Sequence, residues 1–424
     1  MRKKMTISKK NLYKWIYALI FLPLAVRFFT DNFGMPYTIM PMFDILALVI
    51  LFLSYYLTRK ISKKAHILEF WLFIFIGASV ISIIANSGTT LENLFYSGRP
   101  YFRVIFAMLA TAIVFNLKDV ERLYYYIEKL MYLNAIVMTY QFVFQGLRQD
   151  IIGGTFGNNQ GVNSIQNILC IFLFAVTVEF YLKKIISKRK LLINSIIVLY
   201  IAILAEINLV FFEVAIVGGI LFLLNLKITK KISVRMIFLI SIGIIGMLGG
   251  VYLFMKLNPE RVFLLSIKNI SEYLGFNSGN TGVYRISRVK VFSQLGNSFF
   301  NNDMKRWIFG YGLGNCSIHS EFYNLYQNLQ YTNFSSANVF LETGLFGVFA
   351  NLGIIVIGMV LSLKGRRFVT DNKDKAWLDI AFTINVIMVL MFFYNSTLKD
   401  TYTAFFAGVV LAIPYIVLRN KSAN

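Results

Sequence analysis

The sequence predicts an all-α fold, a polytopic bundle of about twelve transmembrane helices without a sizeable soluble domain. Of the 424 residues, 57% are hydrophobic and only 15% are charged. Soluble domains are about 45–50% apolar and about 25% charged, so this chain carries more apolar surface than a soluble interior hides. Apolar segments of membrane-spanning length recur along the chain, and short clusters of Lys and Arg separate them.

A helix that crosses a bilayer needs about 20 predominantly apolar residues. The segments that meet this requirement are 14–30, 42–58, 66–85, 101–116, 123–145, 164–182, 191–208, 210–226, 236–255, 336–362, 378–395 and 402–418. No small-residue cleavage site follows the basic N-terminus, which favours a first membrane helix over a removed signal peptide. Only a short turn separates 191–208 from 210–226, so this pair either crosses twice or forms a re-entrant hairpin.

The distribution of basic residues predicts that both termini are cytoplasmic. With the N-terminus inside, most of the 42 Lys and Arg fall on cytoplasmic segments, as the positive-inside rule requires. The largest of these clusters are the N-terminus, 59–64, 117–129, 183–190, 227–235 and 364–376. The net charge of +22 is therefore interpreted as a topology signal, and no nucleic-acid partner is expected.

This orientation leaves one large extracytoplasmic loop, 256–335, between the ninth and tenth helices. Its aromatic residues and glycine-rich turns predict an ordered loop that lies against the membrane, since long loops in compact proteins are usually functional or disordered. A second outer loop, 146–163, reads GLRQDIIGGTFGNNQGVN, and its Gly and Asn residues favour tight turns.

Carboxylates inside membrane segments are costly and often functional. Glu179, Glu206, Glu213 and Glu342 occupy such positions. Glu179 can reach the cytoplasmic interface, while Glu206 and Glu213 either lie at the interface or line a cavity. Glu342, near the outer end of the tenth helix, is the best candidate for a working carboxylate, and a polar contact with a neighbouring helix is the alternative.

Basic residues on the outer face run against the topology rule and need another explanation. Arg99 and Arg103 flank the start of the fourth segment, Arg148 lies in the glycine-rich loop, and Arg285 and Arg288 belong to the large loop. The planar guanidinium donates two parallel hydrogen bonds to a phosphate. The arginines therefore indicate either general contact with anionic lipid head groups or a pyrophosphate-linked lipid substrate.

His319, in YGLGNCSIHSEF, is a candidate general base, because an unperturbed imidazole titrates near neutrality. An incidental loop histidine is the alternative. Cys170 and Cys316 form no C-x-x-C pair, and the sequence has neither the spacing of a metal site nor a phosphate-binding loop in a strand–helix context. No metal, cofactor or ATP requirement is predicted.

Three stretches resemble the O-antigen polymerase/ligase family, the Wzy-type polymerases of bacterial surface polysaccharides. GGTFGNN (153–159) is similar to the family's glycine-rich loop. The stretch from Arg285 to Gly314 ends in FGYGLG and resembles the family's arginine and its glycine turn. NVFLETGLFG (338–347) resembles the opening of the helix after the large loop. Ala337 stands where ligases are expected to have histidine, which favours the polymerase branch.

The resemblance implies a GT-C-like enzyme of the bacterial cytoplasmic membrane that acts without metal or cofactor. Its substrate would be an oligosaccharide repeat unit on a polyprenyl diphosphate, and a flippase and chain-length regulators would be its possible protein partners. Arg148, with Arg285 or Arg288, would neutralise the diphosphate leaving group. His319 or Glu342 would assist the acceptor hydroxyl. The expected substrate-binding residues are Arg99, Arg103, Asn158, Tyr311 and Asn338.

Two other classes remain open. The first is a lipid-linked oligosaccharide flippase or polysaccharide exporter, against which the long outer loop and the lack of an inverted repeat argue. A deletion that leaves single repeat units displayed outside indicates a polymerase, whereas trapped units indicate a flippase. The second is a glycosyltransferase that uses a polyprenyl monophosphate sugar. It is disfavoured because the first outer loop (31–41) contains a single acidic residue, Asp31.

Overall fold

The computed structural model describes residues 9–58, 66–86, 88–229, 286–288, 290–301 and 303–421, with scattered positions between 234 and 256. Every regular element in these ranges is a helix, and none of the described residues forms a strand. The long helices are α1 (Lys9–Phe33), α2 (Met40–Thr58), α3 (His66–Ala85), α4 (Leu91–Val114), α5 (Leu117–Phe144), α6 (Asn163–Leu182), α7 (Lys188–Leu204), α8 (Asn208–Thr229), α14 (Ser335–Gly365), α15 (Asn372–Tyr394), α16 (Thr401–Leu411) and α17 (Ile413–Lys421).

Eight of the described segments are long and apolar enough to cross a membrane. They are Asn11–Phe33, Tyr37–Leu57, Ile67–Ala85, Asn163–Leu182, Asn208–Leu226, Ser335–Gly365, Asn372–Tyr394 and Thr401–Arg419. The helical membrane class is thus confirmed, whereas a count of twelve stays a prediction. Helices α4 and α5 carry too many polar residues for this criterion, α7 has only 17 residues, and most of 236–255 lies outside the described part.

Large apolar side chains cover the outside of the bundle. Phe52 on α2 and Phe73 on α3 are 68% and 70% exposed, as is Ile136 on α5 at 68%. On α5, exposed apolar residues recur at Leu133, Ile136, Tyr140 and Val143, spacing that places them along one face of a helix. Surface of this kind is stable against lipid tails and costly in water.

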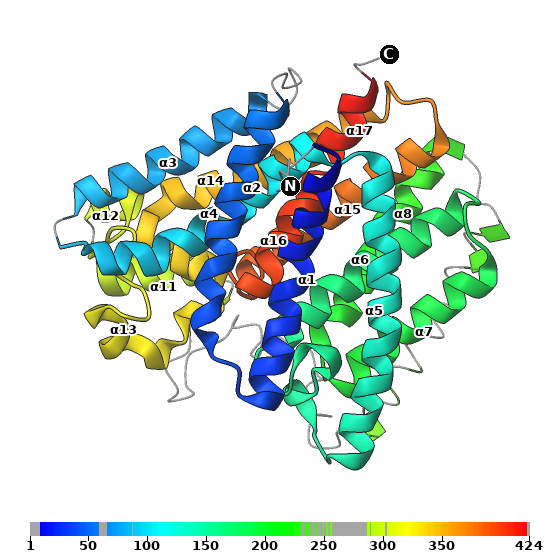
Figure 1. Cartoon of the computed structure of the whole chain (residues 1–424), viewed down its shortest axis with the longest axis horizontal. Coiled ribbons are helices and arrows are strands. Elements are labelled where there is room, and N and C mark those ends of the chain that lie inside the picture. Colours follow the sequence, from blue (N-terminus) through cyan, green and yellow to red (C-terminus); the bar gives the residue numbers. More distant parts are fainter. Residues whose placement is uncertain are drawn as a thin grey trace, which may run out of the picture.

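The most buried helices form the centre of the bundle. Helix α16 packs against α4 and α6, and it lies between the surrounding helices in Figure 1. Gly408 permits the close contact with α4, since a Cβ there would lie 2.6 Å from the carbonyl oxygen of Val104. Small residues allow membrane helices to approach in this way. Helix α14 in turn packs against α3 and α15.

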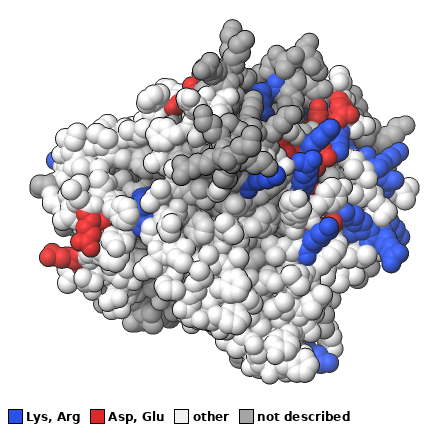
Figure 2. Space-filling model, viewed as in Figure 1, with Lys and Arg blue, Asp and Glu red and all other residues white. Residues whose placement is uncertain are grey.

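Contacts between helix ends divide the bundle into two ends. At the basic end, Arg419 donates to the carbonyls of Ala112, Ile113 and Phe115, where α4 terminates. Lys373 pairs with Glu121 across 2.8 Å at the same end. At the opposite end, called the loop end, the glycine-rich loop after α5 packs on the last turns of α1. In Figure 2, Lys and Arg among the coloured residues concentrate toward the upper right, while most of the remaining face is uncharged.

Several expected helix boundaries differ from those observed. Helices α1, α5 and α15 begin at Lys9, Leu117 and Asn372, before the expected starts at 14, 123 and 378. Helix α4 begins at Leu91 and not at 101. Thr90 caps this start by accepting a hydrogen bond from the Asn93 N–H, and the polar residues of the first turns kept them out of the expected apolar segment. The segment expected at 402–418 is divided into α16 and α17 at Ala412. Pro414 lacks the N–H that would continue the first helix.

The described part of the predicted outer loop contains three short α-helices, α11 (Val291–Leu295), α12 (Met304–Phe309) and α13 (Glu321–Tyr326), besides the single turns η5 (Gly296–Phe300), η6 (Gln327–Leu329) and η7 (Tyr331–Asn333). Of these, α12 packs on α14 and α3, and α11 packs on α14. Helices α11 and α12 therefore pack on the bundle, and the predicted loop of 256–335 stays a prediction. Residues 257–285 lie outside the described residues.

Candidate functional site

A break in α14 organises the loop end. Gly344 has φ 62° and ψ −162°, so the helix is interrupted after its second turn. An interruption leaves backbone carbonyls without their usual N–H partners. The turn formed by Gly310–Gly314 supplies them: the Tyr311 N–H donates to the Leu341 carbonyl at 2.7 Å, and the Gly312 N–H donates to the Glu342 carbonyl at 3.0 Å.

Glycine is required on both sides of this contact. Gly310 has φ 72°, and a Cβ on it would lie 2.5 Å from the carbonyl carbon of Glu342. A Cβ on Gly344 would lie 2.4 Å from the carbonyl oxygen of Ile308. Two motifs that are separate in the sequence, FGYGLG and NVFLETGLFG, are thus parts of one structural unit.

Glu342 lies at the centre of this unit and is 1% exposed. Its carboxylate accepts a hydrogen bond of 2.8 Å from the Ser97 hydroxyl on α4. The Lys399 ammonium, in the connection between α15 and α16, is 3.9 Å from the other carboxylate oxygen. Glu342 therefore joins three elements that are distant in the sequence.

Lys399 has two partners on α14. Its Nζ donates to Oδ1 of Asn338, one helical turn before Glu342. The Lys399 side chain is 18% exposed. Burial lowers the pKa of Lys399, and the nearby Glu342 carboxylate partly offsets that effect. Among the described residues, the carboxylate that contacts this partly buried ammonium is that of Glu342.

Asp44 on α2 binds two arginines of α4. Arg103 donates to both carboxylate oxygens along one edge of its guanidinium, at 2.6 Å from Nε and 2.9 Å from Nη2. Arg99 donates to the same carboxylate at 2.9 Å. Arg103 also donates to the Lys399 carbonyl at 2.5 Å, which joins the two groups of charges. We call Asp44, Arg99, Arg103, Glu342 and Lys399 the charge cluster; it holds three cations and two carboxylates.

The structure assigns different positions to the predicted arginines. Arg103 is committed to Asp44, so it is a structural member of the charge cluster, and its fork is not free for a ligand. Arg99 is 15% exposed and lies 4.5 Å from the Phe95 ring. Arg288 lies over the rings of Tyr394 and Phe334, which flank the backbone hydrogen bond from Ser335 to Asn395. Arg285 lies outside the described residues.

Arg148 and Asn158 belong to a different part of the loop end. Arg148 is exposed, donates to the carbonyls of Phe142 and Leu147, and packs on the Phe142 ring. The Asn158 N–H donates to Asp31 at 3.3 Å, and its side chain bonds to Asn32. Within the described part of the chain, neither Arg148 nor Asn158 contacts the charge cluster, and the contacts of Arg148 and those of Arg288 involve different residues.

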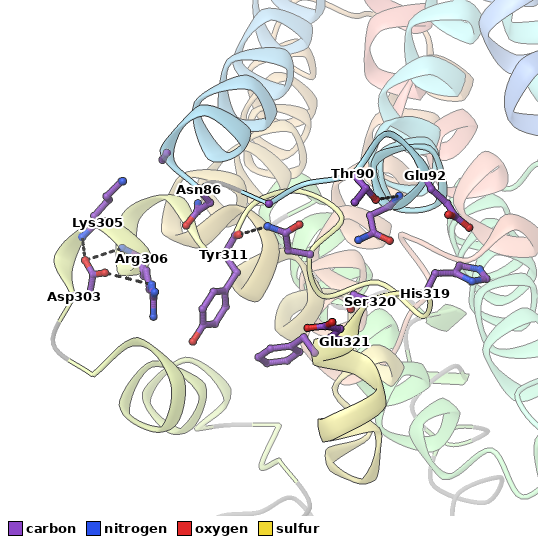
Figure 3. A pocket seen from close by; sticks show the side chains of 15 residues that line it. Asn86, Thr90, Glu92, Asp303, Lys305, Arg306, Tyr311, His319, Ser320 and Glu321 are labelled. Atoms are coloured by element: carbon purple, nitrogen blue, oxygen red, sulfur yellow. Dashed lines mark hydrogen bonds and ion pairs between the residues drawn. The ribbon is translucent and has the colours of Figure 1, made fainter.

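His319 and Tyr311 line a polar cavity of about 780 Å³ beside the glycine turn (Figure 3). The His319 ring packs on Tyr96 with 3.9 Å between ring centroids. The cavity lies between the α3–α4 connection and the segment that contains α12 and α13. Its lining comprises Ala85, Asn86, Gly88, Thr90, Glu92, Asn93, Asp303, Lys305, Arg306, Tyr311, Asn315, His319, Ser320, Glu321 and Phe322.

Sequence reasoning missed Asp44, Ser97 and Lys399. Asp44 and Lys399 are charged residues at the ends of apolar segments, a signal that was available. Their partners are 55 to 61 residues away, which no local pattern reveals. In the ranges that the structure covers, no three His, Cys, Asp or Glu side chains are grouped to hold a metal ion.

The other predicted carboxylates lie elsewhere. Glu179 contacts Lys183 at 3.3 Å, and Lys183 also contacts Asp379, which pairs with Arg366 at 2.6 Å. This group at the basic end balances two carboxylates with two cations and links α6, α14 and α15. Glu206 has φ 52° in the turn before α8, and Glu213 is buried in α8.

Comparison with protein-family models and with curated protein sequences finds no match to this chain.

Proposed function

We propose that the protein is a polymerase that joins oligosaccharide repeat units carried on a polyprenyl diphosphate into a surface polysaccharide. The observation that carries this proposal is the position of Lys399. It is a partly buried cation in the connection between two segments long and apolar enough to cross a membrane, and its ammonium contacts Glu342. The FGYGLG and NVFLETGLFG motifs that motivated the resemblance meet beside it.

The reaction follows from this arrangement. The acceptor hydroxyl attacks the anomeric carbon of the donor sugar, the bond from that carbon to the diphosphate oxygen breaks, and the diphosphate leaves with the electron pair. Lys399, Arg99 and Arg288 stabilise the charge that develops on the diphosphate, as preorganised cations do. His319 or Glu342 accepts the hydroxyl proton, with His319 favoured because it is exposed at the cavity. Glu342 positions Lys399.

The proposal includes about twelve crossings and a GT-C-like arrangement. In support of crossings by α4 and α5, α5 presents an exposed apolar face, and most residues of α4 from Tyr101 onward are buried. The protein would reside in a bacterial cytoplasmic membrane with both termini inside and the loop end outside. A flippase would deliver its substrate, and chain-length regulators would contact it.

A substitution at Lys399 tests the proposal in cells. Lys399→Met keeps the length of the side chain and removes its charge, so long polymer should be lost while single repeat units remain displayed outside. The measurement is gel separation of surface glycans from a deletion strain that expresses the variant. Glu121→Gln, which alters an ion pair at the basic end, should restore full-length polymer. Repeat units trapped inside the deletion strain would instead indicate the flippase.

A further inference from the structure

The cavity beside the glycine turn has the wrong charge for a diphosphate. Three carboxylates line it, Glu92, Asp303 and Glu321, against two cations. One of these cations, Arg306, is paired with Asp303 at 3.4 Å. The cavity therefore has an excess of negative charge, which repels an anionic ligand. The diphosphate belongs at the charge cluster, and the cavity suits another part of the substrate.

The remaining lining matches a ligand rich in hydroxyl groups. Side-chain amides come from Asn86, Asn93 and Asn315, and amides can both donate and accept hydrogen bonds, as sugar hydroxyls do. The Asn86 and Asn315 amide nitrogens donate to backbone carbonyls, so these two residues offer chiefly their carbonyl oxygens. Tyr311 and Phe322 add aromatic surface for the apolar faces of sugar rings. A volume of about 780 Å³ lies within the range of about 300–1,000 Å³ typical of small-molecule sites.

The cavity is connected to the charge cluster through the protein backbone. Asn86 lines the cavity, and its side-chain amide donates to the Gly310 carbonyl at 3.0 Å. Gly310 begins the turn whose next two N–H groups bond to the carbonyls of Leu341 and Glu342. Figure 3 shows Asn86, Tyr311 and His319 on the walls of the cavity. A ligand held there lies across the glycine turn from Glu342.

We propose that this cavity is a carbohydrate subsite that binds the oligosaccharide part of a substrate, separate from the position of its diphosphate. The inference rests on the proposed function for the origin of the sugar. The binding chemistry itself requires only a neutral or amino-bearing oligosaccharide, whose amino groups would face Glu92 and Glu321. His319, at the cavity edge, lies where a hydroxyl of the bound sugar would meet it.

Binding of lipid-free sugar tests the subsite directly. The full chain in lipid nanodiscs is mixed with oligosaccharides released by mild hydrolysis from the surface polysaccharide of the cells that produce it, and saturation-transfer difference NMR measures binding. We expect binding by the wild-type chain and at least a tenfold weaker affinity for the double variant Asn93→Ala/Glu321→Gln. Glu121→Gln, far from the cavity, should bind as wild type does. Gel filtration verifies that each variant is folded.

The same preparations distinguish the subsite from the proposed function. Lys399→Met should still bind the free oligosaccharide, because it alters the charge cluster and not the cavity. Equal binding by the double variant and the wild type, or no binding by the wild type, would overturn the subsite whatever the polymer assay shows. Two results together would keep the subsite and reject the polymerase. The chain in nanodiscs would bind the oligosaccharide through the cavity, and the deletion strain would trap its repeat units inside.

Discussion

Asp44 is the residue on which the arginines of α4 depend. Its carboxylate, 6% exposed, accepts hydrogen bonds from both Arg99 and Arg103. Removing one partner of a buried ion pair leaves the other charge uncompensated, which costs about 3–5 kcal/mol. Asp44 therefore has a structural role that keeps two cations at a fixed place near the end of the bundle.

The variant Asp44→Asn should be strongly destabilised, by about 3–5 kcal/mol, because Arg103 loses its charged partner. Thermal unfolding in detergent, followed by gel filtration, measures the effect. The exposed Arg148→Ala provides the control and should change stability by no more than about 0.5 kcal/mol. Similar unfolding temperatures for the two variants would show that Asp44 is not needed for the packing of α2 and α4.

The charge of Lys399 predicts a pH dependence. Since burial lowers its pKa below the ordinary value of 10.5, the ammonium is present at low pH and is lost as the pH rises through that lowered pKa. Polymer synthesis in isolated membranes should therefore have an alkaline limit set by Lys399. Lys399→Arg should shift this limit to higher pH, because guanidinium stays protonated. Lys373→Arg should leave it unchanged, and a limit that does not move in Lys399→Arg would exclude this role.

The role of a residue could be predicted from the sequence only where that role did not depend on a partner far away along the chain. Glu342 was identified from one sequence feature, a carboxylate in an apolar segment, and the structure places it in the charge cluster. Arg103 was expected to bind substrate, yet it is paired with Asp44, which lies 59 residues away. The sequence contains the charges, but it does not say which charges neutralise one another.

At the scale of elements, the interruption of α14 depends on a backbone conformation that only glycine adopts readily. The values at Gly344 fall in a region with positive φ and extended ψ, which costs other residues about 1–3 kcal/mol. The clash of a Cβ with the Ile308 carbonyl adds to that cost. The glycine turn and the helix break therefore stabilise each other.

The variant Gly344→Ala should separate the turn from α14, lower the unfolding temperature and abolish polymer. Gly77→Ala in α3 is a matched control, since a Cβ there meets no atom within 4 Å and the residue is helical. It should be neutral or slightly stabilising. Thermal unfolding and glycan gels of the two variants provide the comparison, and wild-type behaviour of Gly344→Ala would contradict the role of the break.

Apolar periodicity predicted helix positions well where helices are continuous. The segment 66–85 agrees with α3 at both ends, and 164–182 agrees with α6 within one residue. The break in α14 was not predicted, because the residues on both sides of it are apolar and the hydropathy of the segment is therefore that of a continuous helix. The start of α4 was missed for the opposite reason: its first turns are helical but include polar residues such as Glu92 and Asn93, so they do not look like a membrane span.

At the scale of the molecule, contacts between helix ends sort the connections into two groups. The connection after α1, the loop after α5 and the connection after α15 lie at the loop end. The starts of α5 and α15 lie at the basic end. This division agrees with the alternation of inside and outside that the positive-inside rule predicts.

Cysteine labelling should reveal which end faces outward. Both native cysteines are fully buried, so an impermeant maleimide should not label the wild-type chain. Asn159→Cys at the loop end should be labelled on intact cells, whereas Asn372→Cys at the basic end should require permeabilised cells. Both positions are exposed, which makes them a matched pair. The reverse pattern of labelling would invert the proposed topology.

The backbone bonds between the glycine turn and α14 also limit how the protein can be recombined. The segment 303–322 lines the cavity, but its fit depends on the carbonyls of Leu341 and Glu342 and on the bare Cα of Gly344. An exchange of 303–322 alone would replace one half of a matched pair. Chimeras designed to alter sugar preference should therefore transfer 303–344 as one cassette, with the α3–α4 connection that faces it.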